Sequence, residues 1–108
     1  MTGGWITWAD RARWQLGAAR ELAAILDDYG DLPLITWTVA AGGGVLAGQV
    51  NGLAPAGQVR AAHAAWREAL ALEEYREWPG GGVARLHARG RRGEVQVRIS
   101  ATVFEEAW

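Results

Sequence analysis

The chain has 108 residues, a formal net charge of −1 and no cysteine. This length predicts one domain with a modest core, and the absence of cysteine excludes disulfides, thiol catalysis and cysteine-based zinc sites. The charge argues against a wholly basic nucleic-acid binder, although all eleven basic residues are arginine. No apolar run approaches the length of a membrane span and the start lacks the layout of a signal peptide, so we expect a cytoplasmic protein.

The first predicted element is a helix that follows a loose segment over residues 1–6. Thr7 and Asp10 have the spacing of a capping box, and apolar residues recur at helical spacing from Trp8 to about Tyr29. Gly30 suits the position after the helix, where the chain must turn away. The stripe expected to face the core is Trp8, Ala12, Leu16, Ala19, Leu22, Ala23 and Leu26.

A β-hairpin is predicted next, with strands over 34–40 and 45–50 and a glycine turn between them. Large and small side chains alternate along the first strand, which separates an apolar face from a small, polar one. A slip of one residue would mix the two faces, so the alternation favours one register. In that register the pairs are Val39 with Leu46, Thr38 with Ala47, Trp37 with Gly48, Thr36 with Gln49, and Ile35 with Val50.

The second half repeats the order of helix and hairpin. A helix is predicted from Pro55 to about Glu74, and residues 73–82 are expected to form an exit loop, because a proline and three glycines stop the helix. A second hairpin is predicted over 83–89 and 94–101, with its turn at 90–93. The helix stripe is Val59, Ala62, His63, Trp66, Ala69 and Leu70, and the strand pairs are Ala88 with Val95, Leu86 with Val97, and Ala84 with Ile99.

These elements predict an α+β fold of order αββαββ in one domain over residues 1–108. Two helices covering one face of a four-stranded antiparallel sheet is the natural two-layer arrangement for this order. The opposite face of the sheet is then left uncovered.

The segment Leu-Pro-Leu-Ile-Thr-Trp-Thr-Val-Ala over 32–40, with the glycines after it, and the Ala-Ala-Trp-Arg-Glu-Ala-Leu helix over 64–70 resemble small uncharacterised proteins of high-GC actinobacteria and their mobile elements. The resemblance covers roughly residues 14–103. It implies a fold and carries over no activity or functional residue, and the Arg91-Arg92 segment is not part of it.

The sequence contains no catalytic motif, so we expect no enzyme activity, no cofactor and no metal. The two glycine triplets lack the strand–loop–helix order and the lysine of a phosphate loop. His63 lies in a helix stripe, as expected of a core histidine, and His87 lies among arginines, which repel a cation. The adjacent acidic pairs diverge on their elements and are read as solvated charge rather than as an acid–base dyad.

An arginine-rich hairpin is the first candidate site. In the predicted register Arg85 faces Arg98 on the uncovered face, and like charges placed opposite one another cost stability. The set is either a solvated hairpin end that protects a sheet edge, a docking patch for an acidic protein, or a contact to a nucleic-acid backbone. The candidate residues are Arg85, His87, Arg89, Arg91, Arg92 and Arg98.

A flat patch of small residues on the uncovered face is the second candidate. Such a surface can pack against its own copy around a two-fold axis. We therefore expect a protein–protein interaction module that forms a homodimer, with a nucleic-acid-associated regulator as the alternative and no membrane partner. A small-ligand site near His63 and Trp66 is a third possibility. The predicted dimer face is Leu34, Thr36, Thr38, Ala40 and Ala47.

Overall fold

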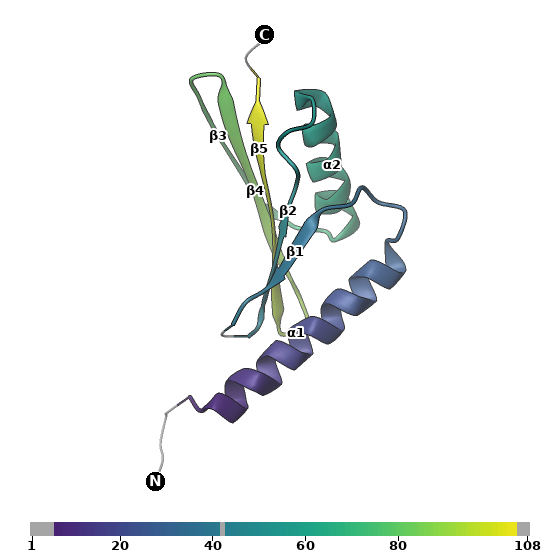
Figure 1. The fold of residues 1–108 in the computed structure, drawn as a ribbon, viewed down its shortest axis with the longest axis vertical. Helices are drawn as coiled ribbons and strands as arrows, with labels where there is room; N and C mark the ends of the chain where they lie inside the picture. The colour runs from purple at the N-terminus through teal and green to yellow at the C-terminus, as the bar shows by residue number, and fades with distance from the viewer. Residues whose placement is uncertain (1–5, 42, 106–108) are drawn as a thin grey trace.

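Two helices cover one face of a five-stranded sheet (Figure 1). The computed structural model describes residues 6–41 and 43–105, so the predicted loose segment 1–6 lies outside the described residues except for Ile6. The order of strands across the sheet is β1-β2-β5-β4-β3. The elements are α1 (Trp8–Asp28), β1 (Thr36–Val39), β2 (Val45–Gln49), α2 (Ala56–Ala69), β3 (Glu74–Gly80), β4 (Val83–Arg92) and β5 (Val95–Phe104).

The α+β class is confirmed, but the predicted four-stranded antiparallel sheet is wrong in two respects. β2 and β5 pair in parallel, so the sheet is mixed. The predicted exit loop over 73–82 contains an additional strand, β3, which pairs antiparallel with β4. β3 tolerates Pro79, which has no backbone N–H, because an edge strand donates hydrogen bonds to a neighbouring strand on one side only. Gly81 and Gly82 both have positive φ and form the two-residue turn that joins β3 to β4.

The register of the first hairpin is confirmed from Val39↔Leu46 to Thr36↔Gln49. The ladder ends at Thr36, so the expected pair of Ile35 with Val50 lies beyond it. A Cβ atom at Gly48 would lie 2.7 Å from Ile99 Cδ1 and 2.8 Å from Ile35 Cδ1. The glycine therefore makes room chiefly for these two isoleucines.

The second hairpin has the predicted faces but a different register. β4 continues through Arg92, and the turn consists of Gly93, with φ of 62°, and Glu94. The strands are consequently longer and their pairing is displaced by four residues. An even displacement leaves every side chain on its expected face. The observed pairs are Ala88 with Ile99, Leu86 with Ala101, and Ala84 with Val103.

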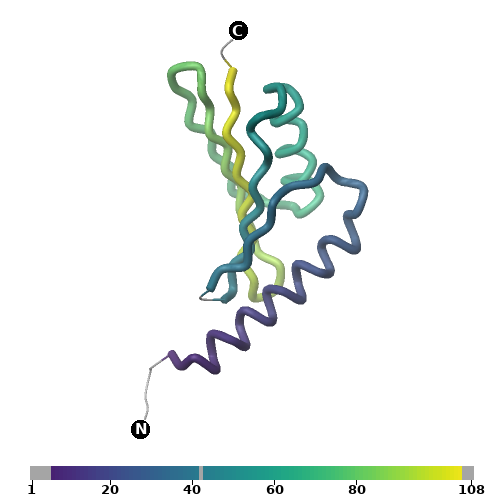
Figure 2. The backbone as a smooth tube through the Cα atoms, viewed as in Figure 1, coloured from purple at the N-terminus to yellow at the C-terminus, as the bar shows by residue number. Residues whose placement is uncertain are grey.

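The capping box of α1 is confirmed, since Thr7 and Asp10 exchange side-chain and backbone hydrogen bonds. The predicted core stripe of this helix is wrong. Ala18 and Ile25 are the buried residues of α1, whereas the predicted stripe is exposed except for the half-buried Leu22. Gly30 follows the helix as expected but does not adopt a left-handed conformation. The N-terminal half of α1 extends past the sheet (Figure 2).

The stripe of α2 is confirmed, and its Trp66 holds the helical layer together. Its ring contacts Trp37 of β1 edge-to-face, with centroids 5.5 Å apart, and Tyr29 after α1 at 6.5 Å. Trp66 Nε1 donates a hydrogen bond of 2.7 Å to the carbonyl oxygen of Pro33. One side chain thus joins both helices, the linker between α1 and β1, and the sheet.

We predict that Trp66→Ala lowers the unfolding free energy by about 3–5 kcal/mol, the usual cost of truncating a large buried aromatic residue. Trp66 is 2% exposed, whereas Trp8 is 84% exposed. Trp8→Ala is therefore the matched control and should leave the monomer's stability almost unchanged. Urea melts of the two variants measure the difference, and equal losses would contradict the packing described here.

α2 ends five residues earlier than predicted, at Ala69. The N–H of Leu72 donates to the carbonyl of Arg67 and that of Ala71 donates to Glu68, which is the hydrogen-bond pattern of a Schellman motif. Ala71 takes the left-handed position of the motif, with φ of 52°, where glycine is usual. This turn directs the chain into β3 instead of another helical turn.

We predict that Ala71→Gly stabilises the fold by up to about 1 kcal/mol. Relief of the left-handed strain at a residue with a Cβ is worth roughly 1–2 kcal/mol, and the greater freedom of glycine in the unfolded chain offsets about 0.4–1 kcal/mol of it. Thermal melts measure the gain. A loss of stability in Ala71→Gly would show that the left-handed turn is not strained.

Candidate functional site

The sheet face opposite the helices is uncovered and rich in arginine; we call it the open face. Residues of odd number in β4 and of even number in β3 and β5 project from it, as the strand pairings require. Glu74 is the acidic residue that these three strands place there. The basic residues of the open face are Arg76, Arg85, Arg89, Arg91, Arg98 and the histidine His87.

Two arginines face each other directly, but not the predicted pair. Arg89 is opposite Arg98, whereas Arg85 is opposite Thr102 and His87 is opposite Ser100. On the β3 side of Arg89, Glu74 accepts a hydrogen bond of 2.7 Å from the Arg89 Nε. Arg98 donates two hydrogen bonds to the side-chain oxygen of Gln96, which is neutral, so no carboxylate in the described structure compensates its charge.

Arg91 and Arg92 do not act together as predicted. Arg91 lies on the open face, with its guanidinium 3.3 Å from the carbonyl of Glu94. Arg92 points to the helical layer, where its Nε lies 2.7 Å from Glu21 Oε2 on α1. This hydrogen bond raises the pKa of Arg92. Arg92 therefore anchors α1 to the sheet and does not belong to the candidate patch.

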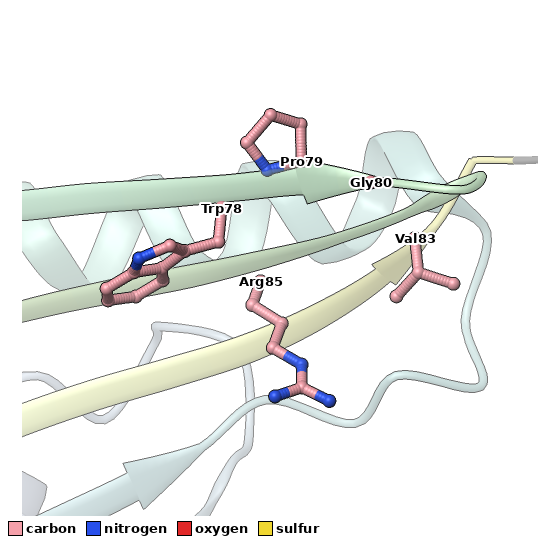
Figure 3. A pocket seen from close by; sticks show the side chains of 5 residues that line it. All are labelled: Trp78, Pro79, Gly80, Val83 and Arg85. Atoms are coloured by element: carbon pink, nitrogen blue, oxygen red, sulfur yellow. The ribbon is translucent and has the colours of Figure 1, made fainter.

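Trp78 of β3 belongs to the open face and is not among the predicted site residues, because the sequence predicts a loop over residues 73–82. The indole lies on the same side of the sheet as Arg85, its cross-strand partner, and Pro79 points to the other side (Figure 3). Shallow depressions of about 530 and 620 Å³ flank it. Arg85 lines the first of these, and Arg76, His87 and Arg89 line the second. The alternation of Glu74, Arg76 and Trp78 along a strand ending in Gly-Gly was the signal in the sequence.

His87 is half-buried among the arginines of the open face. Burial lowers its pKa, and the charges of Arg98 and Arg89 lower it further. Its ring centroid is 6.3 Å from that of Trp78. A neutral imidazole beside an indole adds a flat, partly apolar centre to the positively charged face.

The predicted dimer-face residues lie toward the opposite edge of the sheet. Thr36 and Thr38 project from β1 and are exposed, and Ala47 of β2 is opposite Thr38 and partly buried. Leu34, in the linker before β1, is 95% exposed. Ala40 follows β1 and is partly buried. The small-residue patch therefore borders the arginine-rich part of the open face instead of overlapping it.

His63 lies in the core, as predicted. Its Nε2 is 3.0 Å from the carbonyl oxygen of Ile99, so this nitrogen carries a proton and donates. Elsewhere on the helical side, Arg60 pairs with Glu77 and Glu105 at 2.8 Å each. Within residues 6–41 and 43–105, no group of three or more histidine, cysteine or acidic side chains could hold a metal ion.

Comparisons with known proteins place the chain in no family: no protein-family model matches it, and searches of curated proteins and of solved structures returned no match. Among the described helices, none is long and apolar enough to cross a membrane.

The environment of His63 predicts a pH-dependent stability. Burial lowers its pKa below the ordinary value of 6.5, while the hydrogen bond to Ile99 acts in the opposite direction. Between the two pKa values His63 is protonated in the unfolded chain and neutral in the folded one. Its contribution to stability is therefore fully present above the ordinary pKa of 6.5 and falls as the pH drops toward the lowered pKa.

We expect the unfolding free energy to decrease as the pH falls below about 6.5 and His63→Gln to flatten that decrease. Urea melts at several pH values measure it. The pKa of His87 is also lowered, so His87→Gln measures how much of the decrease comes from that histidine. An unchanged slope in His63→Gln would rule out His63 as the cause.

Proposed function

We propose that this chain is a non-enzymatic protein–protein interaction module whose open face binds an acidic protein surface. The observation that carries the proposal is the gathering of five arginines against one glutamate on an uncovered sheet face. Arg89 and Arg98 are held opposite each other, at a cost that a bound carboxylate would offset.

The side chains around these arginines support a protein partner. Arginine and tryptophan are enriched among the residues that contribute most to protein interfaces. Trp78 stands between two arginine-lined depressions and is 48% exposed. A guanidinium can bind a carboxylate through two parallel hydrogen bonds, so Arg85 and Arg98 are suited to orient an acidic side chain as well as attract it.

Self-association through the open face fits only one part of it. Two-fold packing of the arginine-rich part would bring like charges together. The small side chains Thr36, Thr38 and Ala47 are compatible with such packing, and that interface stays a proposal which the association experiment below also tests.

Single-stranded nucleic acid is the second candidate ligand. Trp78 favours it, because an exposed indole flanked by arginines can stack a base while the guanidinium groups contact phosphates. The formal net charge of −1 weakens this assignment, since a basic protein attracts a polyanion over a longer range. For this reason we rank the acidic protein first.

The test uses a polyglutamate peptide and an oligothymidine as probes, titrated at low and at physiological salt. We expect Arg98→Glu to weaken binding of polyglutamate by at least about tenfold, because it replaces a charge that attracts carboxylates with one that repels them. The control is Arg11→Glu, which makes the same charge change on α1. Equal effects of the two variants, or no binding of either probe, would contradict the proposal.

Trp78→Ala separates the two ligand classes. Loss of base stacking costs about 1–3 kcal/mol per base, so nucleic-acid binding should then fall by roughly tenfold or more. Oligothymidine that binds more tightly than polyglutamate at physiological salt, and that requires Trp78, would replace the acidic protein with nucleic acid.

A further inference from the structure

α1 carries two apolar faces, and the protein uses only one of them for its own core. Ala18 and Ile25 lie on the buried face. Roughly 100° further around the helix, at 3.6 residues per turn, lies a second apolar face that is exposed to solvent. This outer face consists of Trp8, Ala12, Leu16, Ala19, Ala23 and Leu26.

The spacing along the outer face is that of a helix pair. From Ala12 the residues follow one another at steps of four, three, four and three, which is the a/d repeat of a coiled coil. Leu16 and Leu26 are 49% and 48% exposed in the monomer. A helix that needed the sheet alone would have no use for a second apolar row with this period.

The charges of α1 identify the occupant. Arg13 lies in its N-terminal half, where it also pairs with Asp10 of the same helix, and Asp27 lies in its last turn. At 3.6 residues per turn, both border the same side of the outer face. Acidic residues at a helix C-terminus interact unfavourably with the helix dipole. Beside an antiparallel copy, Asp27 would lie near Arg13 and the positive end of the partner helix. The charge pattern is therefore complementary to itself under a two-fold axis.

We propose that two copies of this chain associate through the outer faces of their α1 helices, packed antiparallel. In that arrangement Leu16 of one copy packs on Leu26 of the other, and Ala19 packs on Ala23 in the middle, where small side chains allow close approach of the helices. Arg20 of each copy lies near the axis, and its exposed side chain can turn away from its equivalent. The open face stays free for the partner proposed above.

The first test measures the oligomeric state by sedimentation over a concentration series into the micromolar range. We expect a dimer whose dissociation constant rises by at least about tenfold in Ala23→Glu, because symmetry buries the new carboxylate twice. Ala24→Glu is the matched control, since Ala24 is an exposed neighbour that lies off the outer face. It should leave the dimer intact.

Three outcomes would overturn the proposal. These are a wild-type protein that stays monomeric at the highest concentration, equal effects of the two glutamate variants, and a dimer that Thr38→Arg dissociates while Ala23→Glu does not. The last would place the interface on the open face. Circular dichroism of each variant shows whether it is folded, and the cysteine cross-linking of α1 decides the case if a variant unfolds.

The second test determines orientation by cysteine cross-linking, which a chain without native cysteine makes clean. Leu16→Cys and Leu26→Cys variants of different length, distinguished by a tag, are mixed and oxidised. An antiparallel pair gives the mixed disulfide between the two variants. Disulfides that form only within each variant would show a parallel pair and overturn the antiparallel arrangement.

Discussion

The strict alternation of β5 is the constraint on which the rest of the structure depends. Its odd-numbered side chains from Val95 to Val103 are all buried, and its even-numbered ones are polar from Gln96 to Thr102. Because β5 lies at the centre of the sheet, it pairs with β2 on one side and β4 on the other and fixes which face of each is covered. Both the core under the helices and the arginine-rich open face follow from this one strand.

The parts of the fold that could be predicted from the sequence are those in which side-chain pattern and turn agree. In the first hairpin the alternation fixes which side chains share a face, and the glycine turn between the strands selects one of the registers that keep those faces. In the second, a displacement by four residues keeps the faces intact, and alternation alone cannot distinguish the two registers. β3 was missed because an edge strand with solvent on one side needs no apolar alternation, although its Gly-Gly turn was a hairpin signal.

The candidate site was predicted in part for the same reason. Arg85, His87, Arg89 and Arg98 lie on one face as the alternation predicts, because the face depends on parity and not on register, whereas Arg91 is predicted in the turn and lies in β4. Arg92 was misplaced since the predicted strand ended too early. For α1, two apolar stripes compete, and the helical spacing favours the one from Trp8 to Leu26 as the core. Which stripe packs on the sheet is decided by the position of the helix, and the periodicity of the helix does not contain that information.

The uneven distribution of charge between the two layers makes the molecule an electric dipole. Arginines dominate the open face, while Asp27, Asp28 and Asp31 lie at the end of α1 in the helical layer. With a formal net charge of −1, the protein is barely attracted to a distant charged body, but it experiences a torque within a Debye length of about 8–10 Å. A negatively charged surface therefore acts on this protein mainly by rotating it, so that the open face of the sheet turns toward the surface and the helices turn away from it.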